Sequence, residues 1–230
     1  SVAKRRRRTI WLAIIGLSVA AGAAVLLAPL GLSMFYVART IHDLLRENKQ
    51  LRQAITNLTQ ESQIGYAKVL DQAERGGRLY TKLLFVETDR DDPAKRILQR
   101  EYEIEGDVVY FDALIVKFGD QVVMDGKERA LYLWRRVYGE TTAPAEGLPI
   151  ETEGGEPGRY RDLCAKLSLR DRALFWTEIW SLSNDLDRLA SAGVKAVYGT
   201  VNYRKLRPGL IYMFKITATG HLYSEIVPDL

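Results

Sequence analysis

The amino-acid sequence predicts an α+β protein: a single N-terminal transmembrane helix, a coiled-coil helix, and an antiparallel-sheet domain with helices on one face. Three observations predict this class. Residues 9–38 carry no charged side chain, a heptad pattern of apolar residues begins at Ile41, and the rest of the chain mixes β-rich runs with segments of helical spacing. About 150 of the 230 residues come after the heptads, which is enough for one hydrophobic core.

The uncharged stretch from Thr9 to Ala38 predicts the transmembrane helix. About 20 apolar residues cross the hydrocarbon core of a bilayer. Five basic residues, Lys4 to Arg8, precede the stretch, and positive residues concentrate on the cytoplasmic side of membrane proteins. We therefore expect residues 1–8 to be a cytoplasmic tail of a plasma-membrane or inner-membrane protein, with the C-terminal domain extracytoplasmic (periplasmic in a Gram-negative cell). The alternative is a cleaved signal peptide, which has a shorter apolar core.

Small residues recur at a spacing of four within this stretch, at Gly16, Ala20 and Ala24. This spacing lets two membrane helices approach closely, so we expect these residues to form a transmembrane packing face. The stretch contains no Asp, Glu, Lys, Arg or His, and proton or ion coupling within a bilayer normally needs such a group. An energy-transducing role is therefore disfavoured.

The heptad pattern predicts a coiled-coil or stalk helix over residues 39–75, ended by Gly76 and Gly77. With Ile41 at position a, the expected oligomerisation residues are Ile41, Leu44, Asn48, Leu51, Ile55 and Leu58. Ile at a and Leu at d favour a parallel dimer, and a single Asn at a fixes its register. The alternative is a lone helix that lies against its own domain. The apolar pattern weakens after Leu58.

Residues 77–230 are predicted to form the extracytoplasmic domain. We expect strands at 79–87, 97–104 and 108–118, the last two as a hairpin, followed by a short return at 121–124. The spacing of apolar residues between Asp125 and Gly139 predicts a helix, with a strand as the alternative. Residues 141–158 hold three prolines and are expected to be an ordered flap or a mobile loop.

The C-terminal part is expected to contain helices and then a meander. A short helix is predicted at 160–167, and Phe175, Ile179, Leu182, Leu186 and Leu189 form one helical stripe. Three strands are expected next, at 195–206, 210–218 and 221–227, separated by turn residues. This order of elements is similar to that of extracytoplasmic PAS-like sensor domains of the Cache type. The resemblance implies a single antiparallel sheet and a ligand-sensing role.

Composition limits the chemistry that we expect. The formal net charge is +4, but residues 4–8 contribute +5, so the domain is close to neutral and no nucleic-acid partner is predicted. The chain has one cysteine, Cys164, and two histidines, and it contains no phosphate-binding loop or hydrolase motif. Two groups of candidate metal ligands, Asp89 with Asp91 and Asp92, and His221 with Tyr223 and Glu225, fit a turn and a solvated strand face better.

These observations predict a non-catalytic, single-pass membrane protein without cofactor or metal. We expect it to be a scaffold or accessory subunit of an envelope membrane complex, with the lipid bilayer, a second copy of itself and other membrane or envelope proteins as partners. The alternative is an extracytoplasmic ligand-sensing domain that signals through a partner protein. A cytoplasmic part of eight residues is too short for an output domain.

Overall fold

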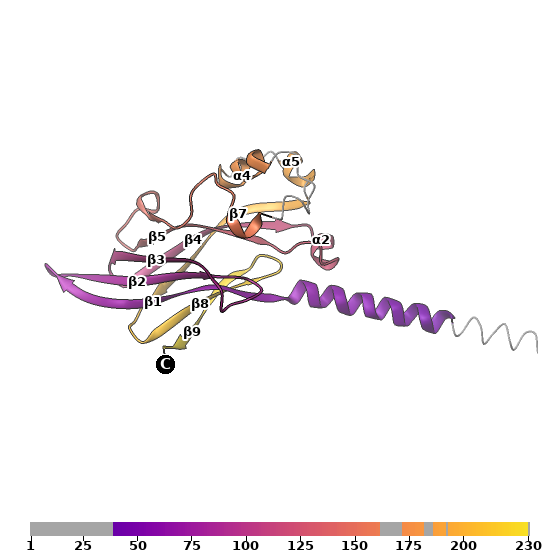
Figure 1. Cartoon of the computed structure of the whole chain (residues 1–230), viewed down its shortest axis with the longest axis horizontal. Coiled ribbons are helices and arrows are strands. Elements are labelled where there is room, and N and C mark those ends of the chain that lie inside the picture. Colours follow the sequence, from indigo (N-terminus) through magenta and orange to yellow (C-terminus); the bar gives the residue numbers. More distant parts are fainter. Residues whose placement is uncertain (1–38, 162–171, 182–185, 192, 230) are drawn as a thin grey trace, which may run out of the picture. The chain divides into compact units, whose positions relative to one another are not determined.

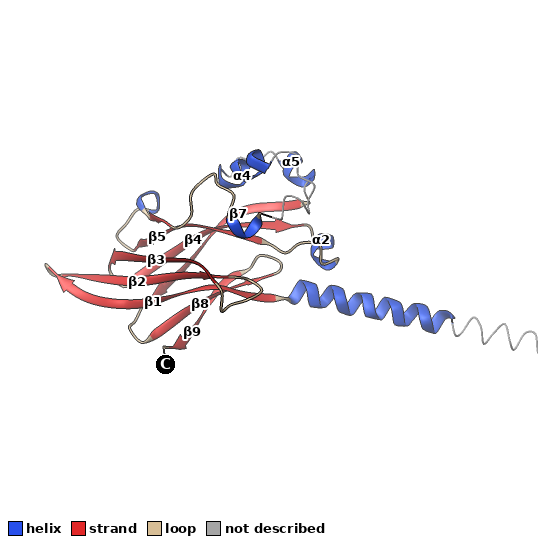
Figure 2. Cartoon of the chain, viewed as in Figure 1, coloured by secondary structure: helices blue, strands red, loops and turns tan. Residues whose placement is uncertain are grey.

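The computed structural model describes residues 39–161, 172–181, 186–191 and 193–229 (Figure 1). The chain divides into two compact units, Ser1–Arg52 and Gln53–Leu230. Residues 39–52, the described part of the first unit, are helical. In the second unit the helix ends at residue 59, and strands make up most of the remaining described residues (Figure 2).

Nine strands form two antiparallel sheets within the described residues. The first sheet has the order β3-β2-β1-β8-β9, and the second has the order β6-β5-β4-β7. The strands are β1 (Glu61–Arg75), β2 (Arg78–Thr88), β3 (Arg96–Glu105), β4 (Val108–Phe118), β5 (Leu131–Gly139), β6 (Leu148–Pro149), β7 (Val194–Lys205), β8 (Leu210–Thr217) and β9 (Leu222–Pro228). The described helices of this unit are α2 (Asp120–Met124), α4 (Arg172–Ser181) and α5 (Leu186–Ser191), with short 3-10 turns η1 (Pro144–Glu146) and η2 (Gly158–Tyr160).

The two sheets face each other across an aromatic core. Phe85 from the first sheet and Trp134 from the second lie edge to face with ring centroids 5.1 Å apart, and Phe111 and Phe214 meet at 4.8 Å. Edge-to-face contacts of this kind stabilise a core beyond the area that they bury. The opposite face of the second sheet carries α4 and α5, so the order of layers is sheet, sheet, helices (Figure 1).

The predicted α+β class is wrong, because the described chain is mostly antiparallel sheet in two layers. The helix expected between Asp125 and Gly139 is strand β5 instead. Tyr132 and Trp134 on this strand face the first sheet, while Leu131 and Leu133 face the helices. Both faces are buried, so apolar residues occupy successive positions and the alternation that marks a half-buried strand is lost.

The expected single sheet and its connections are also wrong. β3 and β4 are consecutive in the chain, but β3 pairs with β2 in the first sheet and β4 pairs with β5 in the second. Residues 105–107 therefore cross between the sheets and form no hairpin. The predicted meander divides in the same way, since β7 pairs with β4 while β8 and β9 pair with each other. The likeness to Cache-type domains, which rested on the order of elements, does not extend to this two-sheet topology.

The second half of the predicted coiled coil is strand β1. The expected core positions Ile41, Leu44, Asn48, Leu51, Ile55 and Leu58 do lie on the helix, but the later positions Ser62, Gly65, Val69 and Gln72 lie in β1. Gly76 and Gly77, expected to end a helix, form the β1–β2 turn with φ of 60° and 77°. A coiled coil of the predicted length is therefore excluded, because a strand cannot carry the heptad seam.

The described residues contain no helix that is both long and apolar enough to cross a bilayer. The transmembrane helix and the single-pass assignment thus have no counterpart in this part of the chain. The residues on which both rested, 9–38 with Gly16, Ala20 and Ala24, lie outside the described residues.

Candidate functional site

The free edge of β5 is completed by the irregular segment 144–160. Residues 148 and 149 form the two-residue strand β6, and the Ile150 and Glu151 amides then donate to the carbonyls of Arg135 (2.9 Å) and Trp134 (3.1 Å). Farther along β5, the Tyr160 hydroxyl accepts from the Tyr132 amide (2.9 Å) and donates to its carbonyl (3.1 Å). The expected long loop is therefore ordered along this edge.

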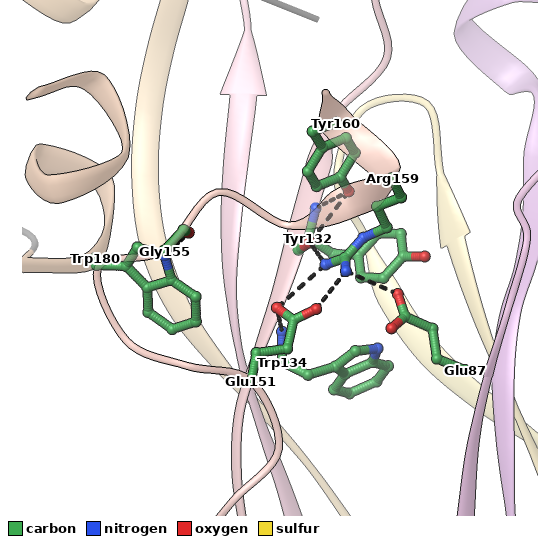
Figure 3. Close-up of polar contacts among 8 residues, drawn as sticks. All are labelled: Glu87, Tyr132, Trp134, Glu151, Gly155, Arg159, Tyr160 and Trp180. Atoms are coloured by element: carbon green, nitrogen blue, oxygen red, sulfur yellow. Dashed lines mark hydrogen bonds and ion pairs between the residues drawn. The ribbon is translucent and has the colours of Figure 1, made fainter. Parts of the chain in front are cut away.

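Arg159 is the centre of a buried ionic cluster between this segment and β2 (Figure 3). Its Nη1 atom pairs with Glu87 Oε1 at 3.0 Å and also with Glu151 Oε1, and its Nη2 atom donates to the Tyr132 carbonyl at 2.5 Å. The guanidinium carbon lies 4.5 Å from the ring centroid of Tyr132 and 4.7 Å from that of Tyr160. Both carboxylates and both rings thus hold one guanidinium in place.

Burial changes the pKa values in this cluster. The side chain of Glu87 is 1 % exposed, and this burial raises the pKa of its carboxyl to about 7, against a smaller lowering effect of Arg159. Burial lowers the pKa of Arg159, but the tyrosines and carboxylates around it outweigh that effect, and its pKa lies well above the usual value. Burial likewise raises the pKa of the Tyr160 hydroxyl.

This cluster joins the 144–160 segment to β2 through Arg159. A pKa near 7 would suit a general base, but Glu87 lies behind Arg159 and a substrate would have to displace the arginine to reach it. Glu151 also accepts a hydrogen bond from the Trp134 amide at 3.0 Å. Trp180 of α4 donates to the Gly155 carbonyl at 2.8 Å and fixes the same segment to the helices (Figure 3).

A pocket of about 350 Å³ lies beside the cluster, between the β2–β3 loop and η2. Arg90, Arg129 and Arg159 line it together with Tyr132 and Tyr160. The loop that carries Arg90 is held by its own carboxylates, since the Asp91 amide donates to Asp89 (3.0 Å) and the Ala94 amide donates to Asp92 (3.1 Å).

A row of tyrosines crosses the outer face of the second sheet. Tyr138, Tyr110 and Tyr203 are register neighbours on β5, β4 and β7, with ring centroids 5.1 and 5.7 Å apart along the row. α4 and α5 pack on the other half of this face, over Leu114 and Leu133. Tyr203 remains 62 % exposed at the end of the row.

Two arginines continue this aromatic row toward a second pocket. The buried carboxylate of Asp112 pairs with Arg135 Nη2 at 2.6 Å and with Arg136 Nε at 3.4 Å. These arginines and Trp180 line a pocket of about 430 Å³ that also includes Arg100 and Glu153. The combined surface, Tyr110, Tyr138, Val201 and Tyr203 with Arg135 and Arg136, is called the aromatic face below.

The candidate residues of the sequence analysis lie in different parts of the structure. The Asp89, Asp91 and Asp92 carboxylates cap the loop or pair with Lys95 and Arg129. On β9, Tyr223 donates to Glu61 Oε2 (2.8 Å) and Glu225 pairs with Lys215 (2.6 Å). Among the expected oligomerisation residues, Ile41, Leu44, Leu51 and Ile55 are more than half exposed, Asn48 is exposed, and Leu58 is partly buried against the core between the second sheet and the helices. Cys164 lies outside the described residues.

Sequence reasoning missed Glu87, Arg90 and Arg159. One signal could have found Glu87: Leu83, Phe85 and Glu87 share one face of a predicted strand, so a carboxylate continues an apolar face. A buried carboxylate requires a cation, but nothing in the sequence pattern selects Arg159, 72 positions later, over the other arginines.

No family model, no curated protein and no solved structure matches this chain. The site must therefore be interpreted from its own geometry.

Proposed function

We propose that this protein is a non-catalytic scaffold or accessory subunit of an envelope membrane complex and binds another protein through the aromatic face. The observation that carries the proposal is the tyrosine row, exposed at Tyr203, beside two arginines. Tyrosine and arginine are enriched at the centres of protein–protein interfaces. Tyrosine buries a large area at low entropic cost, and arginine stacks and donates several hydrogen bonds.

Charge favours a partner with acidic groups around an apolar centre. Arg135 and Arg136 share one carboxylate, Asp112, so one positive charge stays uncompensated within this group. The partner's apolar side chains would pack on Tyr203 and Val201, which are 62 % and 44 % exposed. Complementary charge at the rim of such an interface increases the association rate and the specificity.

The sequence supports the membrane part of the proposal. Thirty uncharged residues, 9–38, come after a run of five basic residues, a distribution typical of chains held at a bilayer with the next domain outside the cytoplasm. The absence of catalysis is supported by the buried cluster, whose carboxylates already hold Arg159.

Copurification tests this proposal. Tagged full-length protein is isolated in mild detergent from the cells that encode it, and the retained proteins are identified by mass spectrometry. We expect Tyr203→Ser to lose at least one membrane or envelope protein that the wild type retains. Ile226→Ser is the matched control, because Ile226 is also exposed (53 %) but lies on β9 in the other sheet. The same set of partners for wild type and both variants would refute the proposal.

The alternative function is ligand sensing through a partner protein. It is favoured by one observation, the 350 Å³ pocket lined by Arg90, which the aromatic face does not explain.

A further inference from the structure

Within the described residues, Arg90 is a cation without a counter-ion in the pocket beside the buried cluster. Four cations line this pocket, and three of them are paired: Lys95 with Asp89 at 3.0 Å, Arg129 with Asp91 at 2.8 Å, and Arg159 with Glu87 and Glu151. In the same described part of the chain, the side chain of Arg90 forms neither an ion pair nor a hydrogen bond, and its Nε and Nη2 atoms are buried.

Two buried guanidinium nitrogens without a partner are unfavourable. Nitrogen donors that lose water without gaining a partner destabilise a fold, and burial lowers the pKa of Arg90. The neighbouring Tyr132 ring, 5.9 Å away, offers weak compensation because it already stacks with Arg159 at 4.5 Å. An anion in the pocket would supply the missing acceptor.

The lining selects the class of anion. Three carboxylates, Asp89, Asp91 and Glu128, line the pocket beside the four cations, and Glu87 and Glu151 compensate Arg159 from outside the lining. A dianion such as phosphate would be repelled by these acidic side chains, whereas a singly charged ligand needs only the unpaired donors of Arg90. Ile97, which is 39 % exposed, gives the same pocket an apolar wall.

We propose that this pocket binds a monocarboxylic acid with a small apolar body, whose carboxylate pairs with Arg90. The planar guanidinium matches the two oxygens of a carboxylate, and Ile97 contacts the apolar body. The site is separate from the aromatic face, so it goes beyond the proposed protein-binding function and would survive that proposal's failure.

Ligand-induced thermal stabilisation of the full-length protein in detergent tests the site, with the unfolding of the buried tryptophans followed by fluorescence. Sodium benzoate is the probe, benzamide its neutral counterpart and sulfate the dianion, all at equal ionic strength. Benzoate is expected to raise the melting temperature in a saturable manner, and benzamide and sulfate are expected to raise it much less. Arg90→Met should weaken the apparent binding of benzoate at least about tenfold.

The controls separate binding from folding. Arg100→Met removes a comparable arginine that lines the other pocket, and it should keep the full response to benzoate. Arg90→Lys keeps the charge but loses the bidentate geometry, so it should bind benzoate more weakly than the wild type, and it replaces Arg90→Met if circular dichroism shows that variant unfolded. An unchanged response in the Arg90 variants, equal effects of benzoate and benzamide, a larger effect of sulfate, or no response to benzoate would each overturn the proposal.

Discussion

Burial decides whether the Glu87 carboxyl is charged at neutral pH. Glu87 continues the core-facing row of β2 behind Leu83 and Phe85, and its pKa is about 7 because burial disfavours the ionised form. Arg159 compensates only in part, since Glu151 competes for the same guanidinium. The free energy of unfolding therefore depends on pH near neutrality.

The direction of this dependence is set by proton binding. Between the ordinary pKa of about 4.5 and the folded value of about 7, the folded protein keeps a proton that the unfolded chain releases. Stability is therefore highest at acidic pH and falls as pH rises through 7, by about 2 kcal/mol between about pH 5.5 and about pH 8. We expect Glu87→Gln to remove most of this slope in urea denaturation.

Glu103→Gln is the matched control, because Glu103 pairs with Arg75 on the exposed side of β3. Its slope should equal that of the wild type. Parallel pH profiles for Glu87→Gln and the wild type would contradict the assignment of the transition to Glu87.

At the scale of elements, the sequence predicts where many strands lie but not how they pair. The predicted runs at 79–87 and 108–118 and the three C-terminal strands lie close to the observed bounds, because β-branched and aromatic residues and turn residues act locally. Strand pairing within each sheet depends on contacts between residues that are distant in the sequence, such as those that join β4 to β7. The sequence predicts a helix over β1 because the heptad pattern is followed by a second stripe at helical spacing, Tyr66, Val69, Leu70 and Ala73.

Gly65 shows how closely two strands of the first sheet approach. It lies at an irregularity in the β1–β8 pairing, and a Cβ atom there would come within 2.4 Å of the Val86 carbonyl oxygen on β2. Gly65→Ala must push β1 from β2 and is expected to lower the free energy of unfolding by about 1–3 kcal/mol. Gly119→Ala should change it little, since the nearest atom lies 3.9 Å away. Equal urea midpoints for the two variants would contradict this account.

At the scale of the whole domain, side chains rather than backbone ladders join the two sheets at one side. Arg204 on β7 donates to the Ser224 hydroxyl (2.7 Å) and carbonyl (3.0 Å) on β9, and the same hydroxyl donates to Asn202 (2.9 Å). β7 and β9 are the last strands of their sheets. This junction should therefore open more readily than the centre of either sheet.

Arg204→Ala is expected to speed the hydrogen exchange of β7 and β9 amides about fivefold, as the loss of about 1 kcal/mol of local stability requires. Amides of β1, in the centre of the first sheet, should keep their protection. Arg207→Ala, in the exposed turn after β7, serves as the control and should leave all three strands unchanged. Uniform acceleration across the domain would show that the junction does not open by itself.

The junction of the N-terminal helix with β1 has a mechanical consequence. The helix ends at residue 59, β1 begins at Glu61, and β1 is flanked on both sides by antiparallel neighbours, β2 and β8. Tension applied from the N-terminal side would enter the domain through its middle strand and load two ladders in shear at once. Because many hydrogen bonds then share the force, the domain resists the extraction of β1. The edge strands of this sheet can detach while β1 stays paired.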